Sequence, residues 1–143
     1  MNIKILCFFC LFFFGAAKSQ EVSGKKIVSD TLAYAKRFET NKEKYLGKPF
    51  SLLLKDMVQM QPKTSKSEFK EDRNDPLPST SFTFSDKEPG SAKEVTMILK
   101  WKPDDSPTTP LEFSEQEHNY RFTPSEKNFL ENRIITGINV YRK

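Results

Sequence analysis

Glu115, Glu117 and His118 form the one cluster in the sequence where carboxylates stand beside an imidazole. Carboxylate oxygens and a ring nitrogen are ligands that zinc accepts, and the same groups carry out general acid and base catalysis. The spacing favours neither role, because in a strand the two glutamates share one face while His118 points to the other. We therefore interpret the cluster as a solvated turn between two strands, and we expect no metal and no cofactor.

Covalent catalysis has few starting points in this chain. The cysteines are Cys7 and Cys10, and His118 is the single histidine, so a serine or cysteine nucleophile would depend on that residue alone. Glycoside hydrolysis needs only two carboxylates, and the chain has 19 acidic residues. A carboxylate-based hydrolase of glycans is therefore the alternative function, although nothing in the sequence selects a catalytic pair.

Two charged patterns lie in the middle of the chain. Residues 72–75 bring oxygen donors together, as calcium sites do, but they lack the alternating donors and the glycine of an EF-hand loop. A turn before Pro76 is the preferred interpretation. The basic residues of this region are Lys63, Lys66, Lys70 and Arg73. Acidic residues alternate with them, which predicts a solvated strand or loop face and no nucleic-acid partner.

Trp101 is the one aromatic residue that we consider for partner binding. It stands at the end of the best predicted strand and next to a proline-rich loop, where an aromatic side chain can anchor a partner. A tryptophan that closes the core of a sheet is the alternative that we prefer.

The elements that must position these residues begin with helices. Apolar residues recur at helical spacing at Val28, Leu32, Ala35, Phe38 and Tyr45. This spacing predicts a helix of about 18 residues from Val28. Gly47 is expected to end it and Pro49 to open a second short helix, giving a bent helix or a helical hairpin.

After residue 58 the apolar period shortens toward two and prolines separate the segments, which is typical of strands and turns. We expect strands at residues 79–85, 92–101 and 134–141, with shorter candidates at 111–113 and 119–122. Residues 63–74 and 102–110 are expected to be exposed loops or extended strand ends. In the last strand, Ile134, Ile138 and Val140 should share one face.

A capping box stands before the last strand. Thr123 is followed by Pro124 and, three residues after the threonine, by Glu126, a pattern that starts helices. It predicts a short helix that ends near Arg133.

These elements predict an α+β domain in which the N-terminal amphipathic helix, or helical hairpin, packs on an antiparallel sheet of four or five strands, with a short helix before the last strand. The expected core consists of Leu32, Phe38, Phe50, Leu54, Phe82, Phe84, Val95, Met97, Leu99, Phe122, Phe129 and Ile138.

The first 19 residues read as a signal peptide, which leaves residues 20–143 as a single domain. Residues 5–17 carry no charge and are too short to span a membrane, and Ala17 and Ser19 suit cleavage before Gln20. Loss of Lys4 and Lys18 lowers the formal net charge from +4 to +2. We expect an exported protein, periplasmic or secreted, with no cysteine and no membrane span after cleavage. The remainder has no Asn-x-Ser/Thr sequon, which fits a bacterial source.

The function that remains by elimination is a non-catalytic binding or interaction module. A sheet face, an exposed edge strand and loops are sufficient for such a role, including that of an inhibitor of an exported enzyme. The expected partner is a protein, a peptide or a surface glycan in the cell envelope or the medium.

Overall fold

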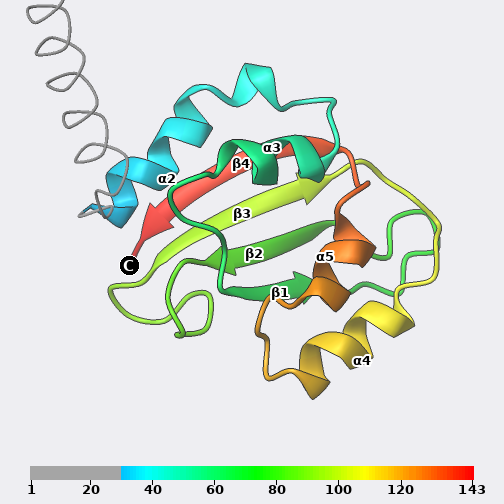
Figure 1. Cartoon of the computed structure of the whole chain (residues 1–143). Coiled ribbons are helices and arrows are strands. Elements are labelled where there is room, and N and C mark those ends of the chain that lie inside the picture. The colour runs from blue at the N-terminus through cyan, green and yellow to red at the C-terminus, as the bar shows by residue number, and fades with distance from the viewer. Residues whose placement is uncertain (1–29) are drawn as a thin grey trace, which may run out of the picture.

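A computed structural model describes residues 30–143 (Figure 1). The elements in chain order are α2 (Thr31–Thr40), the 3-10 turn η1 (Lys42–Lys44), α3 (Phe50–Asp56), β1 (Thr64–Glu68), β2 (Ser79–Thr83), β3 (Val95–Trp101), α4 (Thr109–Glu117), α5 (Pro124–Leu130) and β4 (Ile135–Arg142). The predicted signal peptide, its cleavage site and Val28 lie outside the described residues. None of the helices within residues 30–143 is long and apolar enough to cross a membrane.

The four strands form one antiparallel sheet in the order β1-β2-β3-β4. In Figure 1, α2 and α3 lie over the β3 and β4 half of the sheet, while α4 and α5 lie toward β1 and β2. The short helix α5 directly precedes the last strand. The α+β fold predicted from the sequence is therefore confirmed.

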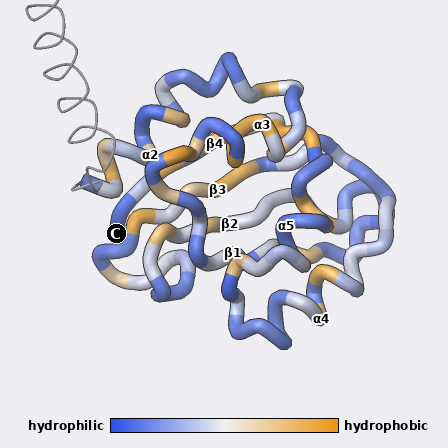
Figure 2. The backbone as a smooth tube through the Cα atoms, in the orientation of Figure 1, coloured by the Kyte–Doolittle hydropathy of each residue, from blue (hydrophilic) through white to orange (hydrophobic). Residues whose placement is uncertain are grey.

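One face of the sheet carries the core. Val95, Met97, Leu99 and Trp101 alternate along β3 and are all buried, as the alternation predicts. On the helix side, Phe50 of α3 is fully buried and its ring lies 5.0 Å from that of Phe82. Figure 2 shows hydrophobic stretches on α3 and the central strands, and hydrophilic loops around them. Of the predicted core residues, Leu32, Phe122 and Phe129 are only partly buried at its margin.

The first helix is shorter than the predicted 18 residues. Asp30 caps its start by accepting a hydrogen bond from the Ala33 amide, and Asn41 ends it by donating its side-chain amide to the Arg37 carbonyl. The chain then forms η1 and turns at Gly47, whose φ of 78° suits glycine. Tyr45 still reaches the core, so its apolar spacing marks burial and not an unbroken helix.

Two predicted short strands are wrong. Residues 111–113 belong to α4, where Leu111 and Glu115 are buried one helical turn apart. Residues 119–122 are not a strand, because Asn119 and Tyr120 both have positive φ angles. This segment instead lies beside β1, with an isolated bridge between Thr64 and Arg121.

The structure refines two further expectations about the sheet. Of the two alternatives for residues 63–74, residues 64–68 take the extended one as the edge strand β1, in which Thr64 and Ser65 are buried. At the start of β4 the buried residue is Ile135, and Ile138 and Val140 are buried further along the strand, whereas Ile134 precedes it and forms a bridge with Pro49. The cause is a β-bulge, since Lys100 pairs with Gly137 but Trp101 pairs with Ile135.

Candidate functional site

The structure separates the cluster of Glu115, Glu117 and His118. All three stand at the end of α4, so helical spacing replaces the strand spacing assumed from the sequence. Glu115 is buried and points toward β1, Glu117 is exposed, and His118 pairs with Glu126 of α5 at 2.8 Å. Within residues 30–143, no three His, Cys, Asp or Glu side chains converge as metal ligands would.

The contacts of His118 resemble a catalytic triad in composition but not in geometry. Glu126 Oε2 lies 2.8 Å from His118 Nδ1, and Ser114 Oγ lies 3.4 Å from the same nitrogen. In a triad the serine and the carboxylate contact opposite ring nitrogens. Ser114 here donates a hydrogen bond to Glu126, so the three residues join α4 to the start of α5.

The pKa shifts of Glu126 and His118 strengthen this contact between α4 and α5. Burial tends to raise the pKa of Glu126, but hydrogen bonds from Ser114, Thr123 and His118 outweigh it and hold the pKa below its ordinary value. The same hydrogen bond to Glu126 raises the pKa of His118. The arrangement thus favours an ion pair between the two helices.

Trp101 and Glu115 lie at opposite ends of one hydrogen-bond chain, which is partly buried at Ser67. The indole of Trp101 donates to Thr80 Oγ1 at 2.9 Å, Thr80 and Ser67 are 2.8 Å apart, and Ser67 Oγ donates to Glu115 Oε2 at 2.6 Å. Trp101 is only 2% exposed, so it packs in the core and offers no surface to a partner in this structure. Burial raises the pKa of Glu115 despite the hydrogen bonds from Ser67.

Asp72 stabilises the turn that the sequence predicts before Pro76. Its Oδ1 accepts a hydrogen bond from the Asn74 amide, and its carbonyl oxygen accepts one from the Asp75 amide. Both the carboxylate and the carbonyl are thus used within the turn, which supports the turn interpretation over a calcium site.

The basic residues of the same region do not gather into one patch. Lys66 lies over the ring of Tyr120 at 5.0 Å and within 4.0 Å of Glu88. Lys70 and Arg73 line a hollow together with Glu71 and Asp72. The local charge is therefore mixed, as the alternation in the sequence predicts.

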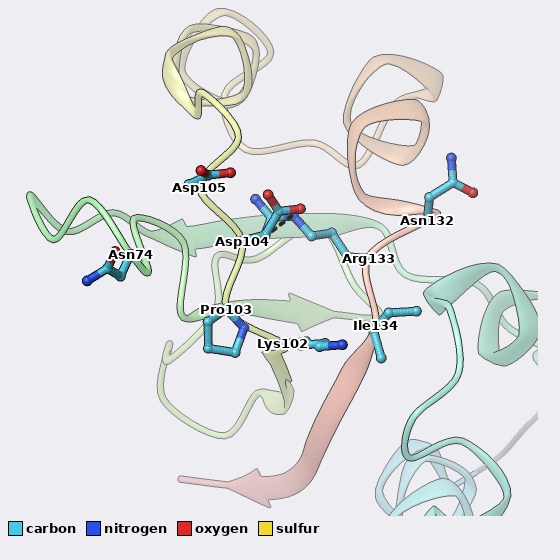
Figure 3. A pocket seen from close by; sticks show the side chains of 8 residues that line it. All are labelled: Asn74, Lys102, Pro103, Asp104, Asp105, Asn132, Arg133 and Ile134. Carbon is cyan, nitrogen blue, oxygen red and sulfur yellow. Dashed lines mark ion pairs between the residues drawn. The ribbon is translucent and has the colours of Figure 1, made fainter.

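The candidate site is a cleft of about 510 Å³ where the α5–β4 junction meets the chain after β3 (Figure 3). Arg133 extends from the junction toward Asp104, with Lys102 and Ile134 to one side. Arg133 is only 6% exposed, and neither Nη1 nor Nη2 has a hydrogen-bond partner among residues 30–143. Asp104 Oδ2 lies 4.0 Å from Nη1, too far for a hydrogen bond.

The backbone around Arg133 is held from several sides. Its amide donates to the Leu130 carbonyl at the end of α5, and its carbonyl accepts from the Phe50 amide at the start of α3. The Lys102 amide donates to the Ile134 carbonyl at 2.8 Å, which ties the loop after β3 to the same junction. The guanidinium is thus presented by packed elements and not by a free loop.

Asp104 is also held, but by another residue. Its Oδ1 accepts hydrogen bonds from both the amide and the hydroxyl of Ser106, at 2.8 and 2.7 Å. These bonds, followed by the nearby Arg133 charge, lower the pKa of Asp104. The carboxylate is therefore ionised at neutral pH but directed mainly at Ser106.

A buried guanidinium without hydrogen bonds is costly, since buried charges are normally paired and hydrogen-bonded. Its two terminal nitrogens match the two oxygens of a carboxylate or two oxygens of a phosphate. The cleft can therefore hold an anionic group, provided that the Asp104 side chain gives way.

Arg133 has no role in the sequence analysis beyond marking the end of a helix. The one signal in the sequence is that Arg133 directly precedes the apolar pair Ile134 and Ile135. Glu131 and Asn132 stand before it, so the local pattern is equally compatible with an exposed arginine at the end of a polar turn.

The chain matches no family model, no curated protein and no solved structure at a significant level. The role of this cleft is therefore argued from its geometry.

Proposed function

We propose that the protein is a non-catalytic binding module that holds an anionic group of its partner against Arg133. The partner is a protein, a peptide or a surface glycan in the cell envelope or the medium. One such partner is an exported enzyme that the protein inhibits. The observation that carries the proposal is the buried guanidinium without hydrogen-bond partners in a polar cleft.

The edges of the sheet are less available to a partner than the cleft, because several of their amides are already hydrogen-bonded. On β1, the Ser65 amide donates to the Tyr120 carbonyl and the Ser67 amide to Glu115. On β4, the Ile135 amide donates to the Lys48 carbonyl and the Val140 amide to Glu39. These bonds occupy groups that an added strand would need, which weakens the exposed edge strand as a route to association.

The alternative, a carboxylate-based hydrolase of glycans, could use the carboxylates of this same cleft. Asp104 and Asp105 both line it. The buried carboxylates of Glu115 and Glu126 are instead hydrogen-bonded to groups that hold the fold. Turnover in a glycan-hydrolysis screen that is abolished by Asp104→Asn or Asp105→Asn would overturn the binding proposal. Stoichiometric zinc that is lost on His118→Ala would do the same.

The direct test follows the Arg133 side chain by NMR while the purified protein is titrated with sodium acetate and, separately, with sodium phosphate. We expect the Arg133 Nε–Hε resonance to shift and saturate with at least one of these anions. The matched control is Arg37, an exposed arginine on α2 whose resonance should not move beyond the general effect of salt. Equal, non-saturating shifts at Arg37 and Arg133 would refute the anion site.

Export is proposed on the N-terminal sequence alone. We expect protein recovered from the producing cells to begin at Gln20, because the apolar segment before it is too short to remain as an anchor. Intact mass spectrometry measures this directly. A mass that retains residues 1–19, or that includes a lipid, would contradict it.

A further inference from the structure

We infer that the anionic group is the carboxylate of an acidic sugar, so that the ligand is a uronate-containing glycan. This inference rests on the proposed function, since it requires that Arg133 binds an anion. It goes further by naming the ligand and by giving Asp104 the role of an internal competitor.

The charge balance of the cleft favours a ligand with one negative charge on each sugar unit over a doubly charged group. Lys102 and Arg133 bring two positive charges, and Asp104 and Asp105 bring two negative ones. A phosphate with close to two negative charges would meet both aspartates without a surplus of positive charge. A carboxylate carries one charge and matches the paired nitrogens of a single guanidinium.

The remaining lining favours a hydroxylated ligand over a peptide. Asn74 and Asn132 bring side-chain amides to the same cleft, and amides both donate to and accept from hydroxyl groups. Of the described residues that line the cleft, Pro103 and Ile134 are the apolar ones. Peptide grooves take part of their specificity from apolar pockets for alternate side chains, and this cleft has no such pocket.

A second hollow extends the cleft. It measures about 490 Å³ and shares Asn74 and Asp105 with the first. Its other lining residues among those that the structure describes include the oppositely charged pairs Lys70 and Glu71, and Asp72 and Arg73, together with Ser106 and Thr108, and none of the described lining residues is aromatic. Two adjoining polar hollows suit a ligand of several sugar units better than a single small molecule.

Asp104 stands where the ligand carboxylate would arrive. Its Oδ2 is 4.0 Å from Arg133 Nη1, while its Oδ1 stays with Ser106. An incoming carboxylate that displaces it could approach to a hydrogen-bonding distance of about 2.8 Å. Asp104→Asn keeps an oxygen for Ser106 but removes the competing charge, so it should strengthen binding, whereas Arg133→Met should weaken it.

Isothermal titration calorimetry of the purified protein with trigalacturonate tests this inference. The matched probe is the same trisaccharide with its carboxylates converted to methyl esters, and tetraglutamate and inorganic phosphate are the competing anions. We expect trigalacturonate to bind and the ester to fail. Arg133→Met should weaken binding at least about tenfold, the scale of one charge-assisted hydrogen-bond pair. Asp104→Asn should tighten it, and Arg37→Gln should leave it unchanged.

The outcomes separate the two proposals. If tetraglutamate or phosphate binds through Arg133 and trigalacturonate does not, the glycan inference is overturned and the anion-binding module stands. If no probe binds, or if Arg133→Met binds as well as the parent, both are overturned. If Asp104→Asn weakens binding while its far-UV and near-UV circular dichroism match the parent, the competitor role is wrong.

Discussion

At the scale of single residues, Arg133 separates function from stability. A buried guanidinium that stabilises the fold is expected to have hydrogen-bond partners, yet Nη1 and Nη2 have none within the part of the chain that the structure describes. Replacing buried ionic groups by apolar side chains of similar size is often neutral or stabilising. Arg133→Met should therefore have a free energy of unfolding equal to or above that of the parent, as measured by urea denaturation. A loss of about 3 kcal/mol or more, the cost of breaking a buried pair, would assign Arg133 to the fold.

Thr123 is the residue whose role the sequence predicts best. The capping box is present, with the Ser125 amide donating to Thr123 Oγ1 and Glu126 Oε1 accepting from the Thr123 amide. Thr123→Ala should lower the free energy of unfolding by ~1 kcal/mol, which urea denaturation can resolve. The control is Thr109→Ala, at an exposed position that begins α4 and does not lie in the predicted loop. Equal midpoints for Thr123→Ala and the parent would show that the cap contributes nothing.

At the scale of elements, acidic side chains cover the two edges of the sheet in the same manner. Glu39 of α2 accepts a 2.6 Å hydrogen bond from the Val140 amide of β4, as Glu115 of α4 does from the Ser67 amide of β1. Each bond fixes a helix against an edge strand and hides a donor that would attract another chain. The helices that flank the sheet thus help to keep it from pairing with itself.

Hydrogen exchange measured by NMR tests the β4 edge. Glu39→Ala should speed exchange of the Val140 amide roughly tenfold, because a hydrogen bond to a charged acceptor is worth about 1.5 kcal/mol. Glu39→Gln keeps an acceptor and should have a smaller effect. Lys36→Ala removes the ion pair with Glu39 but leaves this bond, so it serves as the control. Similar exchange in Glu39→Ala and Lys36→Ala would show that the contact is not formed in solution.

The elements also show where sequence reasoning fails. The β3 alternation and the α5 cap are local signals, and both predictions are correct. β1 has the sequence TSKSE, and its buried positions hold Thr64 and Ser65, so no apolar alternation reveals it. α4 turns Leu111 and Glu115 inward, which places a carboxylate on its buried face and hides the helical period. The hydrogen bond between Ser67 and Glu115 joins β1 to α4, and because it is a tertiary contact no local pattern contains it.

At the scale of the whole molecule, the candidate site escapes the sequence for a similar reason. The cleft joins residues from three separate segments around Asn74, Asp104 and Arg133. Their proximity follows from the strand order and from the contact of the α5–β4 junction with α3. The spacing of residues along the sequence predicts neither of these features. The fold class is predictable because it needs only the order and type of the elements.

Titratable groups across the molecule shift in directions that predict how its stability depends on pH. The carboxyls whose pKa is lowered, and which stabilise the fold when ionised, are Glu39, Asp56, Asp104 and Glu126. Their contribution is complete above the ordinary values of 3.8 to 4.5 and is lost as the pH falls through the lowered values. Glu115 acts in the opposite sense, since burial raises its pKa and its ionisation above 4.5 costs stability. The free energy of unfolding of Glu115→Gln should therefore fall more steeply than that of the parent as the pH is lowered below about 4.5.

His118 determines how the stability of the protein changes above pH 6.5. Its pKa is raised above 6.5, chiefly by the hydrogen bond to Glu126, so its stabilising charge is complete below pH 6.5 and is lost as the pH rises through the higher value. The urea midpoint of the purified protein should thus be highest between about pH 5 and 6.5 and should fall toward pH 8. His118→Gln should flatten that alkaline decline and leave the acidic one in place. An equally steep fall in His118→Gln would show that the ion pair joining α4 to α5 does not form.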